Sequence, residues 1–296
     1  KKTEPGETTG VTYPTYSRVP TQSTHHEPID FSSRPQLNIP GINGTTKTLG
    51  TWWWFYADGV RIETREKYLD FCKYNGITEI YYYCYALMGT ANYRQETHEF
   101  IESAMRRGIR CSVLYDDPKS QEVDNTYFTD HVVHDYLLYK QEYPSDWLYG
   151  IHCDVEHKVS AANAQKYVDN FLLPEVVPAI QQGVYVELDL SVNYTSGIQI
   201  NYTGSPIHEY SGTKADFYTI VAHNCNTMCM MSYRTSADAL VRSTEYCRSI
   251  AKAANCRILF GIELGDSGEG NGVDFSKKSA QTAYNVLEEF DSRLKA

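Results

Sequence analysis

The ten residues VYVELDLSVN, at positions 184–193, distinguish between two arrangements of a parallel sheet. Valine and leucine occupy the even positions, whereas Glu187, Asp189 and Ser191 occupy odd ones. Because side chains in a strand alternate between two faces, one face is apolar and the other carries two carboxylates. A strand of an open sheet covered on both sides would be apolar on both faces. The segment is instead typical of a barrel strand whose inner face opens into a polar cleft.

Strand-like runs alternate with helical patterns from residue 50 to the end of the sequence. Strands are expected at 51–56, 77–85, 109–116, 148–156, 184–193, 226–234 and 257–264. The clearest helical stretches are 63–74, 94–107, 236–254 and 279–296. Glycine follows three helical patterns, at Gly76, Gly108 and Gly183, where a left-handed cap is favoured. This repetition predicts a parallel sheet and an α/β fold of the (β/α)8, or TIM-barrel, type.

The eighth strand of that barrel is not identified in the sequence. Only seven strand–helix units can be assigned, and the chain stops after the helix at 279–296. The eighth strand is therefore missing from the sequence given, supplied by residues 36–49, or absent.

Charge and apolar patterning disfavour two classes of protein. Lys and Arg total 27 against 37 Asp and Glu, a net charge of −10, and no basic block occurs, which argues against nucleic-acid binding. No apolar run approaches the roughly 20 residues of a membrane span. The 25 Tyr, 10 Phe and 4 Trp suit a carbohydrate partner, but aromatic residues are also ordinary core material. The oligomeric state is not indicated.

The first 40 residues differ in composition from the rest. They hold six of the eleven prolines, together with seven Thr and four Ser. Such a stretch buries too little apolar surface to offset its ordering entropy, so residues 1–40 are expected to form a tether or arm. Residues 41–296 would form the barrel and carry the catalysis. A Thr/Pro-rich tether, in a sequence that starts with Lys rather than Met, is typical of a secreted or cell-surface protein.

The eight cysteines do not have the spacing of a metal or disulfide framework. No C-x2-C pair occurs, and the nearest cluster is His223, Cys225 and Cys229. Several cysteines fall inside expected strands, where a free thiol packs like a small apolar residue. We therefore expect no metal site and no cofactor. A disulfide near Cys247 and Cys256 is left open.

The expected strand at 148–156 carries the strongest catalytic signal. His152, Asp154 and Glu156 alternate with apolar residues, so a period of two places all three inside the barrel, at the strand end where barrel active sites lie. Two carboxyls that close resist joint ionisation, and one is expected to keep a proton, as a general acid must. The alternative is structural: Asp154 caps a helix and Glu156 is solvated.

This strand resembles the fourth strand of glycoside hydrolase family 18, which comprises chitinases and endo-β-N-acetylglucosaminidases on TIM barrels. The family motif D-x-x-D-x-D-x-E, commonly DGIDIDWE, aligns without a gap on residues 149–156 (YGIHCDVE). Gly150, Ile151, Asp154 and Glu156 match. Tyr149 and His152 replace the first two aspartates. The Ser-x-Gly-Gly pattern of the family's third strand and its terminal-strand Trp are absent.

A second motif, M-x-Y-D in the family, is similar to Met231-Ser232-Tyr233-Arg234 except at its last position. The resemblance implies a retaining hydrolase of glycans that contain N-acetylhexosamine. It implies that Glu156 is the acid/base, that Asp154 orients the substrate's N-acetyl group and that Tyr233 hydrogen-bonds it. The N-acetyl oxygen would then be the nucleophile, which is an exception to the two-carboxylate scheme.

Two alternatives remain open. Glu263 ends the last expected strand, and with Glu156 it would form a two-glutamate retaining glycosidase if the carboxyls lie about 5 Å apart. Its structural alternative is an ion pair with an arginine such as Arg234. The other possibility is a barrel that binds glycans without cleaving them. Candidate substrate-binding residues are His152, Asp189, Trp53, Asp116 and Arg234.

Overall fold

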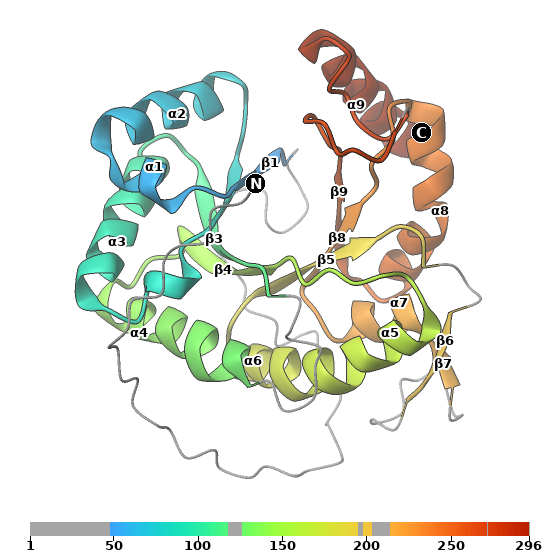
Figure 1. The fold of residues 1–296 in the computed structure, drawn as a ribbon, viewed down its shortest axis with the longest axis horizontal. Coiled ribbons are helices and arrows are strands. Elements are labelled where there is room, and N and C mark those ends of the chain that lie inside the picture. Colours follow the sequence, from blue (N-terminus) through green and yellow to red (C-terminus); the bar gives the residue numbers. More distant parts are fainter. Residues whose placement is uncertain (1–47, 118–125, 195–197, 203–213, 271, 296) are drawn as a thin grey trace.

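The computed structural model describes residues 48–117, 126–194, 198–202, 214–270 and 272–295, and its centre is a curled sheet of seven parallel strands (Figure 1). In spatial order the strands are β1 (Gly50–Trp53), β2 (Glu79–Tyr82), β3 (Arg110–Tyr115), β4 (Leu148–Cys153), β5 (Val186–Ser191), β8 (Thr227–Met231) and β9 (Arg257–Gly261). All seven expected strands are present, and the predicted α/β barrel class is confirmed. All seven strands end earlier than the sequence pattern suggested.

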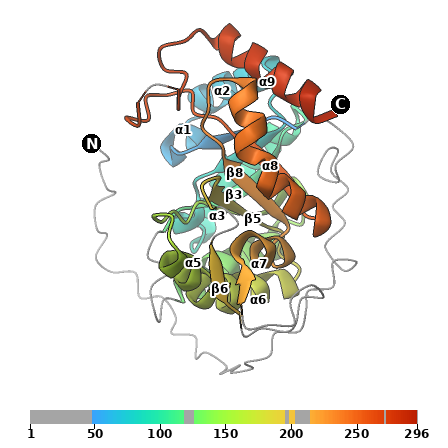
Figure 2. The same ribbon diagram turned by 90° about the vertical axis from the view of Figure 1, so that its right-hand side faces the viewer.

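Helices cover the outer face of the curled sheet (Figures 1 and 2). They are α1 (Tyr56–Val60), α2 (Ile62–Tyr74), α3 (Ala91–Met105), α4 (His134–Glu142), α5 (Ala161–Tyr167), α6 (Val177–Gln181), α7 (Phe217–His223), α8 (Ala237–Ala253) and α9 (Ala280–Lys295). π-Helical turns at Phe128–Val133 and Val168–Val176 lead into α4 and α6, and a 3-10 turn covers Tyr85–Leu87. The expected glycine caps are confirmed, with φ of +74° at Gly76, +73° at Gly108 and +87° at Gly183.

One element was not foreseen: a small antiparallel pair of β6 (Gln199–Asn201) and β7 (Lys214–Asp216), inserted between β5 and α7. Its three-residue strands are too short to give a periodic signal. No helix of the described residues combines the length and apolarity needed to cross a membrane.

The ring of strands is open among the described residues. β1 pairs with β2, β9 pairs with β8, and no backbone pairing joins β1 to β9. Residues 36–47, one candidate source of an eighth strand, lie outside the described residues, as does the expected tether at 1–40. Side chains still reach across the opening, since the guanidinium of Arg257 donates to the hydroxyl of Thr48 at 3.4 Å.

The apolar core lies between the sheet and its helices, while the inside of the ring is strongly polar. Arg257 Nη2 lies 2.6 Å from Glu79 Oε1, and Arg257 Nη1 lies 3.0 Å from Glu187 Oε1. Arg110 also pairs with Glu79. Both carboxylates are fully buried. Buried ions persist only when paired, so these cross-strand pairs neutralise the floor of the barrel.

All eight cysteines are buried thiols, and none of them forms a disulfide. The disulfide considered near Cys247 and Cys256 is not formed. Cys256 lies instead beside Cys225, with sulfurs 3.9 Å apart. The sequence cluster of His223, Cys225 and Cys229 does not form a group of converging ligand atoms.

Candidate active site

The strand end that carries the family-like motif is positioned by a close contact between two backbones. A Cβ on Gly150 would lie 2.2 Å from the carbonyl oxygen of Tyr185, so only glycine lets β4 approach β5 this closely. β4 ends at Cys153 rather than at residue 156. The backbone N–H of Asp154 still donates to Tyr115 O at 2.7 Å, which extends the pairing with β3 by one residue. Asp154 is therefore held in register at the carboxyl end of the sheet.

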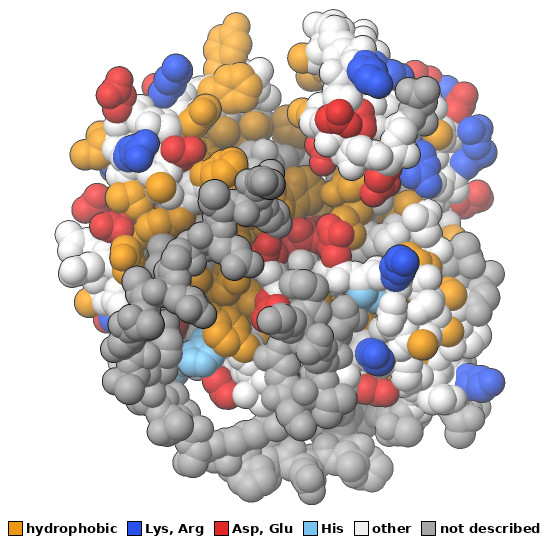
Figure 3. Space-filling model, in the orientation of Figure 1, with side chains coloured by type: hydrophobic (Ala, Val, Ile, Leu, Met, Phe, Trp, Pro, Cys, Tyr) orange, Lys and Arg blue, Asp and Glu red, His pale blue; other side chains and the backbone are white. Residues whose placement is uncertain are grey.

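Asp154 and Glu156 occupy different environments. Glu156 is exposed, whereas Asp154 is half-buried and its Oδ1 is buried without a hydrogen-bond partner. Burial, together with the nearby charges of Asp189 and Glu156, raises the pKa of Asp154 to about 8. Asp154 therefore holds a proton at neutral pH, which is the asymmetry expected of two close carboxyls. Figure 3 shows acidic side chains gathered in a hollow at the centre of the molecule.

The hydroxyl of Tyr233 lies within the electrostatic influence of several carboxyl groups from different strands. It follows β8 and is half-buried. Burial raises the pKa of its hydroxyl, and the charges of Asp189, Asp154, Glu156 and Glu263 raise it further. Carboxyl groups on β5 and just beyond β4 and β9 thus act electrostatically on this one phenol.

Glu263 follows β9 and is tied to the loop beyond it. Its Oε1 accepts a hydrogen bond from the N–H of Gly265 at 2.6 Å, and its carbonyl accepts one from Phe275 at 2.9 Å. Among the described residues, no ion pair joins Glu263 to Arg234. The Arg234 guanidinium donates instead to Tyr233 O at 2.7 Å and to Asn193 Oδ1 at 3.5 Å. The ion pair considered as the structural alternative for Glu263 is therefore not formed.

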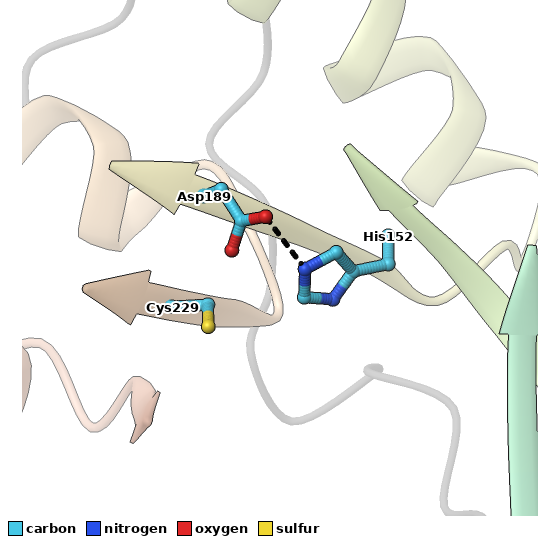
Figure 4. Close-up of side chains that lie close together, drawn as sticks. All are labelled: His152, Asp189 and Cys229. Atoms are coloured by element: carbon cyan, nitrogen blue, oxygen red, sulfur yellow. Dashed lines mark ion pairs between the residues drawn. The ribbon is translucent and has the colours of Figure 1, made fainter. Parts of the chain in front are cut away.

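His152 and Asp189 lie below the strand ends, inside the barrel, and both are buried. His152 Nε2 lies 2.9 Å from Asp189 Oδ2, and its Nδ1 lies 3.1 Å from Glu187 Oε2 (Figure 4). Burial alone would lower the pKa of His152, but Asp189 and Glu187 outweigh it and raise that pKa to about 10. The burial of His152 and Asp189 does not favour the direct substrate contacts that the sequence led us to expect for them. It favours a supporting position beneath Asp154.

Trp53 does not reach the inside of the barrel. Its ring packs edge-on against Phe100, with centroids 5.2 Å apart, on the helix-covered face of the sheet. This position does not favour the substrate-binding role expected of Trp53. The neighbouring Trp52 points inward, and its indole N–H donates to Asp189 Oδ2 at 3.0 Å. Asp116 lies at the end of β3, where its charge acts on Tyr83 and Asp154.

Sequence reasoning missed the inward role of three side chains. Tyr81 lies flat against His152, with ring centroids 3.8 Å apart. The Tyr149 hydroxyl donates to Glu187 at 2.8 Å, and Cys229 faces His152 and Asp189. For Tyr81 and Cys229 the period of two was available as a signal, because Tyr81 shares its face with Glu79 and Cys229 with Thr227.

Comparison with known proteins adds little to this geometry. No family model and no curated protein matches the sequence. The spore cortex-lytic enzyme SleL of Bacillus megaterium is 12% identical, with a TM-score of 0.41 over 68% of this chain and 47% of its own. An O-GlcNAc hydrolase from Thermobaculum terrenum is 11% identical, with a TM-score of 0.41 over 75% and 47%.

A D-psicose 3-epimerase from Clostridium cellulolyticum is 9% identical, with a TM-score of 0.44 over 84% of this chain and 97% of its own. The match covers 47% of the spore cortex-lytic enzyme and 47% of the O-GlcNAc hydrolase, so this chain spans about half the length of those two proteins. The three names cover lytic, hydrolytic and epimerising enzymes, and at these TM-scores the likeness does not select a reaction.

Proposed function

We propose that this protein is a retaining glycoside hydrolase that acts on glycans containing N-acetylhexosamine, with Glu156 as the acid/base. The observation that carries the proposal is the placement of an exposed Glu156 beside a half-buried Asp154, with Tyr233 in reach of both charges. A proton donor must reach solvent-borne substrate, whereas the groups that orient the substrate belong deeper in the pocket. The two environments match these two roles.

The reaction that fits this site has two steps. When substrate binds, Asp154 passes the proton it holds to Glu156. Glu156 then protonates the glycosidic oxygen while the carbonyl oxygen of the substrate's own acetamide attacks the anomeric carbon and displaces the leaving group. Asp154 and Tyr233 hold the acetamide in line for that attack. Water then attacks the same carbon, breaks its bond to the acetamide oxygen and returns a proton to Glu156, which yields a product of retained configuration. The substrate class rests on the resemblance of residues 149–156 to family 18.

A second candidate function uses Glu263 as a carboxylate nucleophile. The supporting observation is that the charges of Glu156 and Glu263 both act on the Tyr233 hydroxyl, so both carboxyl groups lie in its neighbourhood. The bond from the Gly265 N–H holds Glu263 Oε1 toward its own loop, and this bond would have to break or rotate for attack. The acetamide route needs no such rearrangement, and we therefore rank it first.

The test is product analysis by mass spectrometry on N-acetylhexosamine glycans and on matched glycans without the acetamide. We expect cleavage of the acetamide-bearing glycans alone, lost in Glu156→Gln and kept in Glu245→Gln, a matched change on the exposed face of α8. Loss of cleavage in Glu263→Gln, together with activity on plain glycans, would support the two-glutamate route. Glycan binding without turnover in the wild type would make the barrel a binding protein.

A further inference from the structure

We propose that His152, Asp189 and Cys229 form a zinc-binding site inside the barrel, beneath the strand-end carboxylates. The three residues come from adjacent strands β4, β5 and β8, and one ligand atom of each lies within 4.8 Å of the other two (Figure 4). Nothing in the proposed hydrolase chemistry requires this site, and its test is independent of that activity.

The ligand atoms of this cluster are buried and incompletely paired. His152 is fully buried, and its Nε2 is ion-paired with Asp189 Oδ2 at 2.9 Å in a geometry too poorly aligned for a hydrogen bond. Asp189 Oδ1 is also buried without a hydrogen-bond partner. Buried polar atoms are rarely left without a partner, so the exceptions need an explanation. An ion seated between them would satisfy both atoms at once.

The surrounding residues orient the ligands as the outer shell of a metal site does. His152 Nδ1 lies 3.1 Å from Glu187 Oε2, so Nδ1 can donate to that carboxylate, and loss of the proton between Nε2 and Asp189 would leave Nε2 facing the ion. A ligating histidine almost always donates its other N–H to such a partner. On the opposite side, the Trp52 indole N–H donates to Asp189 Oδ2 at 3.0 Å, which leaves Oδ1 available.

The donor set favours zinc among common divalent ions. A thiolate, an imidazole and a carboxylate are the three ligand types of zinc, whereas Mg²⁺ and Ca²⁺ take oxygen ligands. Tetrahedral zinc places its ligand atoms about 3.5 Å apart, so the widest separation in the cluster, at most 4.8 Å, needs to shrink by no more than about 1.3 Å. The ion brings two positive charges in exchange for the proton between His152 and Asp189 and the thiol proton of Cys229. The net charge of the barrel interior is therefore unchanged.

The site has three protein ligands and an open fourth position. Asp154 lies toward the strand ends and acts electrostatically on both His152 and Asp189, and its buried Oδ1 also lacks a hydrogen-bond partner. Three protein ligands with an open position are typical of zinc that holds water or another small ligand. A site of this kind would tie the centres of β4, β5 and β8 together.

The test starts from protein that has been treated with a chelator and then separated from it by gel filtration. This protein is titrated with Co²⁺, and Zn²⁺ is then added in competition. We expect one Co²⁺ per chain, a near-ultraviolet thiolate-to-cobalt band, and displacement of both by one equivalent of Zn²⁺. Cys229→Ser should remove the band and weaken binding by at least about 100-fold, while Cys111→Ser, a matched buried thiol on β3, should leave both intact. Trp52→Phe should weaken binding about 10-fold through Asp189.

Asp189→Asn provides a second ligand variant should Cys229→Ser lose its circular dichroism signal. It preserves shape and should likewise weaken Co²⁺ binding. Absence of stoichiometric uptake in the wild type would overturn the proposal, and so would uptake that persists unchanged in both ligand variants. In those cases the cluster is a buried ion pair beside a thiol.

Discussion

The ring of Tyr81 lies flat on the imidazole of His152, with the ring centroids 3.8 Å apart and an angle of 15° between the ring planes. The two side chains come from β2 and β4, which β3 separates, so the stack crosses the inside of the barrel. Tyr81 also donates from its hydroxyl to Glu79 Oε2 at 3.0 Å. Tyr81 thus contacts both the buried, ion-paired carboxylate of Glu79 and the imidazole of His152.

Removing this ring should cost far more stability than removing its hydroxyl. Tyr81→Ala opens a cavity under His152 and should lower the free energy of unfolding by about 3–5 kcal/mol. Tyr81→Phe should lower it by about 1–2 kcal/mol, because Glu79 keeps two arginine partners. Urea unfolding of both variants measures the difference. Equal losses would show that the stack contributes nothing beyond the hydroxyl.

Arg257 should be a second sensitive position. It pairs with both Glu79 and Glu187, so Arg257→Met strips a cation from two buried carboxylates and should cost about 3–5 kcal/mol. Adding Glu187→Gln removes one of those stranded charges. In a double-mutant cycle by urea unfolding, the double variant should lose less stability than the sum of the single variants. Strict additivity would mean that the two groups do not interact.

Tyr233→Phe tests the position given to the acetamide. The change removes one hydrogen-bond donor from the proposed pocket and should lower kcat by about 100-fold on a substrate that Glu156 cleaves. KM should change much less, because the bond is worth most in the transition state. Tyr284→Phe, an exposed tyrosine on α9, is the matched control and should leave kcat unchanged. A Tyr233→Phe enzyme of full activity would remove Tyr233 from the mechanism.

A pH-dependent contribution to stability is expected where α2 meets α3. Burial raises the pKa of Glu66, but hydrogen bonds from Ser103 at 2.5 Å and Arg107 at 2.7 Å, with Arg65, lower it to about 2. The pKa of a glutamate in an unfolded chain is about 4.3. The folded pKa is depressed, so the contribution is present above pH about 4.3 and is lost as the pH falls toward 2.

Glu66→Gln should therefore lower the stability measured at pH 6 and flatten its loss between pH 6 and pH 3. Urea midpoints of wild type and variant at the two pH values test this. Parallel losses in both proteins would show that Glu66 does not contribute to the acid sensitivity of the fold.

The sequence predicted the secondary structure well because local rules govern it. All seven strands and the four clearest helices were located, and Gly76, Gly108 and Gly183 take the positive φ that a left-handed cap requires. The strand bounds were less accurate. The expected strand at 148–156 ends at Cys153, because pairing with β5 stops there while the polar side chains continue.

Alternation along one strand also indicated correctly that β5 turns Glu187 and Asp189 inward, since a period of two is a property of the chain itself. It could not choose a face for three consecutive tryptophans, where apolar residues occupy both faces. Only packing against Phe100 on one side and Asp189 on the other separated Trp53 from Trp52.

What the sequence alone determined is the βα repeat and the carboxylates at its strand ends, since both follow from spacing along the chain. The tertiary structure decided which side chains meet. Cys229 lies 77 positions from His152 in the sequence, and no local pattern relates them. They become neighbours because β4, β5 and β8 are adjacent in the sheet, and strand order is set by the packing of the whole barrel.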